Sequence, residues 1–248
     1  MDYEHDDKFK PNVQMGVIIV VTVLLYLFFG LSGAAYLQHS TYYLLMFLGA
    51  VVGAFVVFGD EMGEKLKFTT MNVPLTNVIL YGALLGIMLA TLETFSAGNT
   101  MFIQQTVGDT GSIIPQLTGN TALLISTIVF IGLFSTITSI SEETLTRGFF
   151  ASIAEEYAEN DTTKNISKYI LIPLIFSLLH YFMWARSGMI DITGLFGVVF
   201  LLMYHFTFAV ICQFSMDVTG SIYTPITLHA IYNAIKMLMV IGIIGVGV

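Results

Sequence analysis

The feature that most constrains this chain is a series of apolar blocks, each about 20 residues long, separated by short polar stretches. A helix of that length spans the hydrocarbon core of a bilayer, because it rises about 1.5 Å per residue. Charged residues make up 10% of the 248 residues, against about 25% in an ordinary soluble domain. The sequence therefore predicts an all-α fold, a polytopic bundle of about seven or eight transmembrane helices around an intramembrane polar cavity.

We predict seven membrane spans from these blocks. They cover residues 15–37, 41–58, 78–92, 121–140, 169–185, 192–212 and 222–242. The first is longer than the roughly 7 to 15 apolar residues of a signal peptide, so we interpret it as a span. The expected organisation is a polar tail over 1–14, N-terminal transmembrane helices over 15–120 and a second transmembrane unit over 121–248.

The balance of charge excludes one class of partner and predicts an orientation. Acidic residues outnumber basic ones by 17 to 9 and the cations do not cluster, so no nucleic-acid surface is expected. Lys and Arg are retained on the cytoplasmic side of membranes, and residues 93–120 contain neither. We therefore predict a multi-pass protein of the cell membrane, with a cytoplasmic N-terminus and membrane lipid as a partner. The supporting cations are Lys8, Lys10, Lys65, Lys67, Arg147, Lys164 and Lys168. Arg186 falls on the opposite side.

Two pairs of glycines have the spacing that lets membrane helices approach closely. Gly49 and Gly53 are four residues apart, as are Gly82 and Gly86. We interpret both pairs as packing sites within the chain rather than as a dimer interface. The sequence leaves the oligomeric state open.

A few ionisable residues fall inside or at the edge of predicted spans. Each costs at least about 2.5 kcal/mol at bilayer depth, and so marks a candidate functional site. The strong candidates are Glu142, Glu143, Arg147, His180 and His229, and the weaker ones are Glu93 and His205.

The two glutamates are expected to lie on one helix with different surroundings. The helix of the span at 121–140 is predicted to continue to Gly148, because glycine commonly ends helices. Glu143 and Arg147 then lie four residues apart on one face and pair, whereas Glu142 is turned by about 100°. One carboxylate is neutralised and the other stays available. The alternative is that all three residues simply begin a cytoplasmic loop.

The histidines of the later spans indicate a shared site. His180 is expected about 16 Å, and His229 about 10 Å, from the cytoplasmic end of its helix. Asn233 lies one turn beyond His229 on the same face. The sequence therefore predicts that Glu142, His180 and His229 converge in a cavity that opens towards the cytoplasm.

Three motifs follow one another on successive predicted helices. They are Glu142-Glu143-x-x-x-Arg147, Phe176-x-x-x-His180 and His229-x-x-x-Asn233. Together they closely resemble the motifs of the CAAX protease and bacteriocin-processing family, also called the Abi family, which includes type II CAAX prenyl endopeptidases. The resemblance covers roughly the C-terminal half of the chain and identifies the unit over 121–248 as a catalytic core.

The resemblance implies an intramembrane endopeptidase of about eight helices. It implies that Glu142 and His180 activate a water molecule, and that His229 and Asn233 hold the carbonyl oxygen as it becomes an oxyanion. Arg147, paired with Glu143, would be structural or orienting. His229 is expected to donate a hydrogen bond in either protonation state. The chain departs from the family in its seven predicted spans, so an eighth helix would have to lie within 95–120.

Metal dependence is left open. Two histidines and a glutamate, here His180, His229 and Glu142, would suit a catalytic zinc or another divalent metal ion. The His-Glu-x-x-His motif of soluble zinc proteases is absent from the sequence. A glutamate-activated water with no required cofactor is therefore the favoured interpretation. His205 belongs to none of the three motifs and is interpreted as a packed core histidine.

The leading hypothesis is a membrane-embedded protease acting on a peptide or prenylated protein. Its reaction would be the C-terminal processing of a prenylated CAAX-type peptide, or the maturation of a leader or bacteriocin-like peptide. One alternative is a non-catalytic membrane protein, a bacteriocin self-immunity factor or scaffold that uses the same site for binding. Another is a proton-coupled transporter with the carboxylates and histidines as a relay, although no internal repeat is visible.

Overall fold

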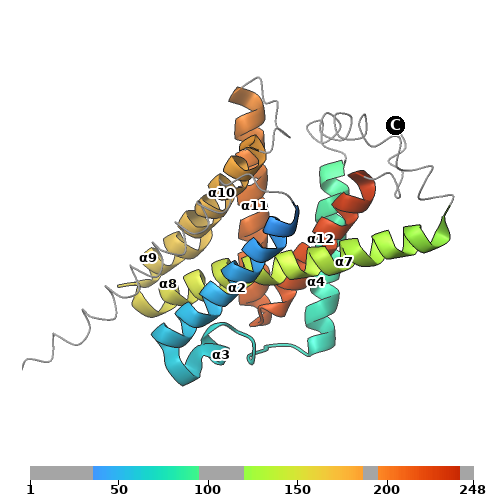
Figure 1. Cartoon of the computed structure of the whole chain (residues 1–248). Coiled ribbons are helices and arrows are strands. Elements are labelled where there is room, and N and C mark those ends of the chain that lie inside the picture. The colour runs from blue at the N-terminus through green and yellow to red at the C-terminus, as the bar shows by residue number, and fades with distance from the viewer. Residues whose placement is uncertain (1–35, 95–119, 187–194, 241–248) are drawn as a thin grey trace, which may run out of the picture.

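The computed structural model describes residues 36–94, 120–186 and 195–240, and within these ranges the chain is helical and has no strand (Figure 1). The predicted all-α class is therefore confirmed for the described part of the chain. The first elements are α2 (Tyr36–Phe58), η1 (Gly59–Glu61), α3 (Met62–Lys65) and α4 (Leu75–Thr94). They are followed by α7 (Thr121–Glu143), η2 (Thr144–Phe150), α8 (Ala151–Tyr157), α9 (Asp161–Ile166), η3 (Ser167–Leu171), α10 (Ile172–Arg186), α11 (Leu195–Thr219) and α12 (Tyr223–Val240).

Some predicted segments lie outside the described residues. They are the polar tail over 1–14, nearly all of the span predicted at 15–37, and the stretch within 95–120 where an eighth helix was expected.

Four of the described helical segments are long and apolar enough to cross a membrane. They are Tyr43–Lys65, Leu75–Leu92, Thr121–Tyr157 and Leu201–Thr219. These segments overlap the spans predicted at 41–58, 78–92, 121–140 and 192–212. The chain is thus a helical protein with at least these four candidate membrane helices.

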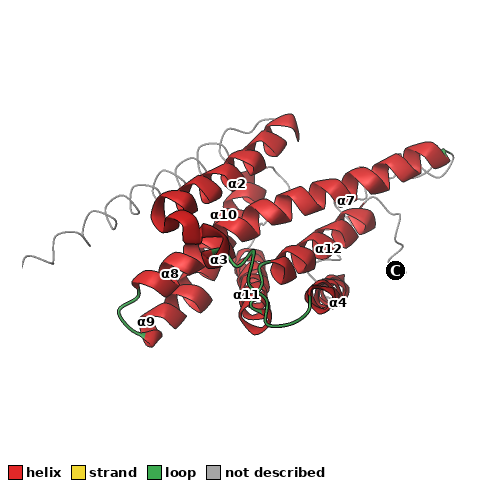
Figure 2. Cartoon of the chain, turned by 90° about the horizontal axis from the view of Figure 1, so that it is seen from below, coloured by secondary structure: helices red, strands yellow, loops and turns green. Residues whose placement is uncertain are grey.

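The helices at the other two predicted spans, α10 and α12, are not among these four candidates. The helix α10 has 15 residues, and α12 carries several polar side chains on 18 residues. The helix α12 packs against α4, α7 and α11, and both Figure 1 and Figure 2 show it beside α4. Because its neighbours shield it, α12 can carry polar groups that a lipid-facing helix could not.

One helical rod extends well beyond the point where the sequence predicts an end. Residues Thr121–Tyr157 form a continuous helical segment in which α7 passes into η2, a π-helix, and then into α8. Gly148 was predicted to end this helix, and that prediction is wrong. A Cβ atom at Gly148 would lie 3.0 Å from Ile222 Cδ1 and 3.3 Å from Leu66 Cδ2. The absence of a side chain at Gly148 thus lets the rod pack closely against Ile222 and Leu66 and does not end the helix.

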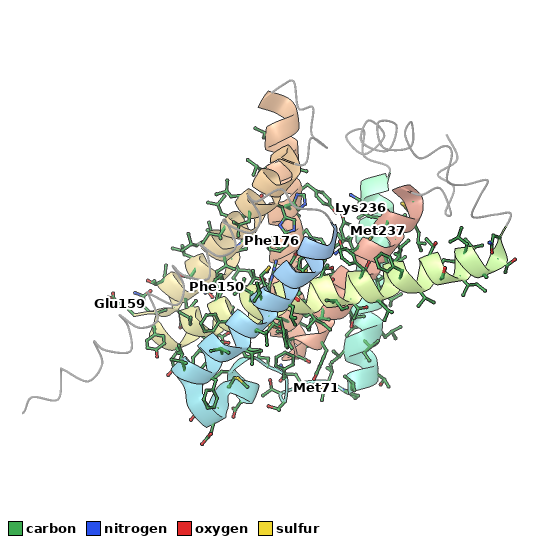
Figure 3. All side chains as sticks on the ribbon, in the orientation of Figure 1. Met71, Phe150, Glu159, Phe176, Lys236 and Met237 are labelled. Atoms are coloured by element: carbon green, nitrogen blue, oxygen red, sulfur yellow. The ribbon has the colours of Figure 1, made fainter. Side chains whose placement is uncertain are left out.

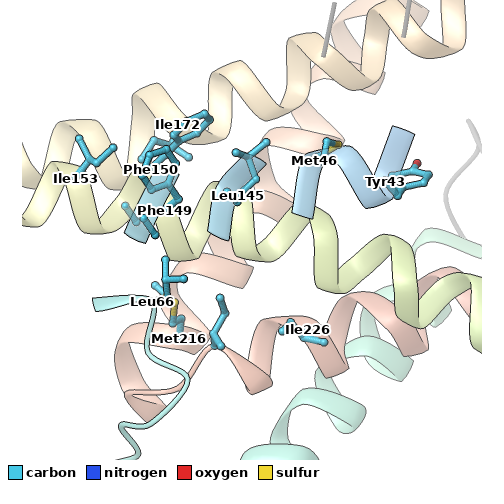
Figure 4. Packing of buried hydrophobic residues seen from close by; sticks show 14 residues of the cluster. Tyr43, Met46, Leu66, Leu145, Phe149, Phe150, Ile153, Ile172, Met216 and Ile226 are labelled. Carbon is cyan, nitrogen blue, oxygen red and sulfur yellow. The ribbon is translucent and has the colours of Figure 1, made fainter. Parts of the chain in front are cut away.

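A buried apolar cluster surrounds η2 and holds it against its neighbours. Leu66, Phe149 and Met216 are among its most buried members, and they come from the loop after α3, from η2 and from α11 (Figure 4). Ile222, the residue directly before α12, joins them. The cluster therefore couples the position of η2 to that of α12.

The glycine pair on α4 lets that helix touch α12. A Cβ atom at Gly82 would lie 2.6 Å from the Thr224 carbonyl oxygen, and one at Gly86 would lie 2.5 Å from the Leu228 carbonyl oxygen. This confirms the intramolecular packing predicted for Gly82 and Gly86. At Gly49, in contrast, a Cβ atom would meet nothing within 4 Å.

Charged side chains join four elements at one end of the bundle. Lys168 in η3 lies 2.5 Å from Glu155 Oε1 in α8 and 2.9 Å from Asp217 Oδ1 in α11. Lys67, in the loop after α3, reaches the same two oxygens at 3.2 and 3.4 Å. The Tyr169 hydroxyl donates to Asp217 Oδ2 at 2.6 Å. Asp217 thus holds Lys168 and Tyr169 of η3 and Lys67 of the loop after α3.

We expect Asp217→Asn to lower the free energy of unfolding by about 2 kcal/mol, because it removes one of the two carboxylates that buried Lys168 and partly buried Lys67 share. The measurement is thermal denaturation of the purified protein in detergent. The matched control is Asp161→Asn, since Asp161 is an exposed residue that pairs only with its helix neighbour Lys164 among the described residues. The control should leave the melting temperature unchanged. Equal melting temperatures for both variants would contradict a structural role for the network.

Candidate active site

The two adjacent glutamates stand at the junction between α7 and η2. Both are buried, with 4% of Glu142 and none of Glu143 exposed. The Thr146 hydroxyl donates to the Glu142 carbonyl oxygen at 2.6 Å. A π-helical turn widens the helix and changes the direction of the side chains that follow it, and such turns often occur at functional sites. The site thus begins where the regular α-helix ends.

Glu143 and Arg147 form the predicted pair inside the protein. Arg147 Nε lies 3.3 Å from Glu143 Oε2, and Arg147 Nη1 donates to the Thr146 hydroxyl at 2.6 Å. The guanidinium carbon also lies 4.5 Å from the centroid of the Phe176 ring. Cations over aromatic faces are stabilised by the ring quadrupole. Arg147 is therefore fixed by a carboxylate, a hydroxyl and a ring.

His180 is oriented by the other residue of its motif. Its Nδ1 lies 2.9 Å from the Phe176 carbonyl oxygen, and its ring centroid lies 4.1 Å from that of Phe176. Because a carbonyl oxygen only accepts hydrogen bonds, Nδ1 carries the proton. The unprotonated Nε2 of the neutral ring then faces Glu142 Oε2 at 3.4 Å.

His229 contacts both glutamates. Its Nδ1 lies 2.7 Å from Glu143 Oε1, and its Nε2 lies 3.8 Å from Glu142 Oε2. The Glu143 carboxylate accepts a hydrogen bond from Nδ1–H, so the neutral ring of His229 has no proton on Nε2. With Nδ1 donating to Glu143, Nε2 donates to a further group only when the ring carries both protons.

One carboxylate oxygen of Glu142 faces a hydrogen-bond acceptor on each of two histidines. Glu142 Oε2 is buried and has no hydrogen-bond donor among the described residues, while two imidazole Nε2 atoms lie 3.4 and 3.8 Å away. Three acceptors this close are stabilised by a group that donates to them, and a water molecule can donate to two at once. Glu142, His180 and His229 thus form a binding site for a polar hydrogen-bond donor.

Two further residues take different positions around this centre. Asn233 lies one turn beyond His229 on α12, and no side-chain hydrogen bond joins it to the glutamates or histidines in the described part of the chain. His205 Nδ1 lies 3.0 Å from the Leu201 carbonyl oxygen, as a packed core histidine would. Its ring also stacks on His180, with centroids 4.8 Å apart. His205 therefore contacts the site although it belongs to none of the motifs.

Sequence reasoning missed several residues that line this region. Phe208 packs on His229 with ring centroids 4.9 Å apart, and Tyr232 packs on Phe208 at 4.8 Å. No local pattern distinguishes these rings from other apolar residues of their helices. Lys236 was also missed, although it is an ionisable residue within the span predicted at 222–242, the same signal that marked His229.

The geometry also bears on metal binding. No group of three or more His, Cys, Asp or Glu side chains is placed to hold a metal ion within residues 36–94, 120–186 and 195–240. Glu142, His180 and His229 all lie within these ranges, so they do not form such a group. One nitrogen of each histidine is engaged by Phe176 or Glu143, so only the two Nε2 atoms and the Glu142 carboxylate face one another.

Comparison with known proteins places the site within a family. Residues 121–235 match the family described as type II CAAX prenyl endopeptidase Rce1-like. This segment contains every residue of the three motifs on which the resemblance rests. No curated protein and no solved structure matches the chain. The chain therefore carries, over residues 121–235, a domain of the Rce1-like family of type II CAAX prenyl endopeptidases.

Proposed function

We propose that this protein is an intramembrane endopeptidase that removes a short C-terminal peptide from a membrane-associated, prenylated CAAX-type substrate. The observation that carries the proposal is the Glu142 carboxylate oxygen flanked by the Nε2 atoms of His180 and His229, within the matched domain. Family membership supports a peptidase. The buried carboxylate and the adjacent imidazoles supply what hydrolysis of a peptide bond needs, a base and a means of placing water.

The first step is the activation of water. A water molecule between Glu142 Oε2 and His180 Nε2 donates one hydrogen to each, which leaves its lone pairs directed at the substrate carbonyl carbon. As the new C–O bond forms, Glu142 takes the proton and becomes a carboxylic acid. His180 keeps its Nδ1 proton on the Phe176 carbonyl oxygen throughout and therefore acts by orientation.

The second step is the collapse of the tetrahedral intermediate. We assign this step to the form of His229 that carries a proton on both nitrogens; held by the Glu143 carboxylate, it donates from Nε2 to the oxyanion, together with the Asn233 amide. When the C–N bond breaks, the proton on Glu142 passes to the leaving nitrogen. The products are an amine and a carboxylic acid, which then loses its proton to solvent, and Glu142 returns to its ionised form. Arg147 balances the charge of Glu143.

The position of the protein in the membrane forms part of the proposal. We place the N-terminus and the opening of the site on the cytoplasmic side, in agreement with the distribution of Lys and Arg. The full chain would cross the membrane seven or eight times. A leader or bacteriocin-like peptide is the other substrate that the same chemistry could serve.

The test is hydrolysis of a prenylated reporter peptide by purified protein in detergent or liposomes. We expect cleavage by the wild type, and cleavage by His180→Ala that is slower by about 100-fold or more, since a positioned base partner is lost. A wild-type rate no higher than that of His180→Ala would rule the protease assignment out. The non-catalytic alternative predicts that outcome.

The same assay with a strong chelator decides the role of metal. We expect the rate to change by less than about twofold, because the proposed water is activated by a carboxylate and an imidazole. If chelation abolishes cleavage and zinc restores it, a metal held by Glu142, His180 and His229 replaces this mechanism.

A further inference from the structure

His205 is an ionisable residue inside α11 to which the mechanism above assigns no role. Such a residue is costly at bilayer depth, and this makes a function worth seeking. Its Nδ1 lies 3.0 Å from the Leu201 carbonyl oxygen, so Nδ1 carries the proton and the hydrogen bond fixes how the ring is turned. Tyr204 packs edge-on against the same ring, with centroids 5.5 Å apart and an interplanar angle of 88°. Two contacts therefore hold the plane of the His205 ring.

The packing of α10 against α11 brings this ring to His180. The two helices run in opposite directions, because Phe176 of α10 stacks on Phe208 of α11, and the later His180 stacks on the earlier His205. Figure 1 shows α10 and α11 side by side, and Phe176 is labelled in Figure 3. The two histidine rings have centroids 4.8 Å apart and an interplanar angle of 28°, within the range of stabilising stacked pairs. The stack thus joins His180 to a helix other than its own.

The proposed role of His180 depends on the direction of one nitrogen. Its Nε2 faces Glu142 Oε2, which lies 3.4 Å away and belongs to α7. The hydrogen bond of His180 Nδ1 and its close contact with a phenyl ring both involve Phe176, four residues earlier on the same helix. His205 restrains the ring from a second helix, because rotation about the Cβ–Cγ bond of His180 would drive the edge of its ring into the face of His205.

We propose that His205 is a positioning residue for hydrolysis: its ring face holds the His180 imidazole in the plane from which Nε2 orients the attacking water. The proposal rests on the proteolytic function above. In this role His205 takes no proton and acts only through His180. Reaction rates depend steeply on orientation, and a displacement of about 1 Å can cost about 100-fold. A His180 ring that is held less firmly therefore lowers kcat and leaves KM near its wild-type value.

Two substitutions separate the ring of His205 from its hydrogen bond. His205→Phe keeps a flat ring and loses the Nδ1 donor, whereas His205→Asn keeps an amide donor and loses the ring. In cleavage of the prenylated reporter peptide, we expect kcat of His205→Phe within about threefold of the wild type and kcat of His205→Asn lower by about 10-fold or more. KM should stay within about twofold in both variants. If His205→Asn lowers the melting temperature, His205→Leu replaces it with the same expectations.

A double-mutant cycle tests whether His205 acts through His180. In the His180→Ala background there is no imidazole to hold, so His205→Asn should change the residual single-turnover rate by less than about twofold. A further 10-fold loss in that background would overturn the proposal, because general loosening of the helices lowers the rate in both backgrounds alike. Equal kcat values for His205→Phe and His205→Asn would overturn it too, since the ring would then make no difference.

The control variant is Thr207→Val on the exposed face of α11. Its hydroxyl donates to the Met203 carbonyl oxygen of the same helix, at 2.8 Å. We expect kcat within about twofold of the wild type, as for other surface substitutions away from the reaction. The control thus has the same helix as His205→Asn and also loses a polar group, but lacks the contact with His180.

Acylation of His180 by diethyl pyrocarbonate, measured by peptide mass, separates this proposal from the proteolytic function. If the wild type does not cleave the reporter, the proposed function fails, and the acylation rate then decides the role of His205. A loosened ring turns Nε2 away from buried Glu142, so His205→Asn should react about fivefold faster or more than the wild type, and His205→Phe at the wild-type rate. Equal rates for the wild type and His205→Asn would show that His205 does not hold the His180 ring.

Discussion

Glu142→Gln is expected to lower kcat for reporter cleavage by about 1,000-fold or more while leaving the protein folded. The amide has nearly the shape of the carboxylate but cannot take a proton from water, so the general base is lost. The orienting contacts of the two histidines do not depend on Glu142, because Phe176 and Glu143 hold their Nδ1 atoms. The measurement is single-turnover cleavage at saturating enzyme, with thermal denaturation to check the fold.

The matched control for this experiment is Glu159→Gln. Glu159 is an exposed acidic residue, and Figure 3 shows it at the outer end of the turn between α8 and α9. The same chemical change at this position should leave kcat within about twofold of the wild type, as expected for a surface substitution away from the reaction. A Glu142→Gln protein that still cleaved at the wild-type rate would show that the carboxylate is not the base.

The members of the candidate site could be predicted because the membrane makes ionisable residues conspicuous. Glu142, His180 and His229 are costly at bilayer depth. An ionisable residue in a predicted membrane span is therefore a stronger sign of function than the same residue in a soluble protein. The pairing of Glu143 with Arg147 followed from the spacing of four residues on a helix. Hydropathy and residue spacing along single helices were therefore enough to identify these side chains.

The connections between them could not be predicted in the same way. Glu143 and His229 are 86 residues apart in sequence, and the 2.7 Å contact of their side chains depends on how α12 packs against α7. That contact determines which nitrogen of the neutral His229 ring carries the proton, and so whether Nε2 can donate. Contacts between distant segments set the chemistry of a histidine, and spacing within one helix contains no information about them.

Gly148 shows how tertiary packing overrides a local signal. Glycine near the end of an apolar helix commonly marks its C-terminus, and the sequence offered no competing pattern. In the structure the rod continues through Gly148, where an added Cβ atom would lie 3.0 Å from Ile222 Cδ1 and 3.3 Å from Leu66 Cδ2. The π-helical turn that results holds Arg147 where it meets both Glu143 and Phe176.

The contact between α4 and α12 leads to the second prediction. A Cβ atom at Gly86 would lie 2.5 Å from the Leu228 carbonyl oxygen and 3.1 Å from Ile231 Cβ. The first of these neighbours is backbone, so the helices can accept a methyl group only by moving apart. Leu228 directly precedes His229, and any shift of α12 is therefore passed to the site.

Gly86→Ala is accordingly expected to lower the free energy of unfolding by about 3 kcal/mol, at the upper end of the usual range for overpacking. Cleavage should fall together with stability, because displacement of α12 moves His229 away from Glu143 and Glu142. Thermal denaturation and reporter cleavage measure the two effects.

The control is Gly132→Ala on α7, where nothing lies within 4 Å of the added carbon. There alanine should leave cleavage unchanged and stabilise the helix by up to about 1 kcal/mol. Similar melting temperatures for Gly86→Ala and Gly132→Ala would show that α4 and α12 are not in close contact, and that the glycine pair serves another purpose, such as association between chains.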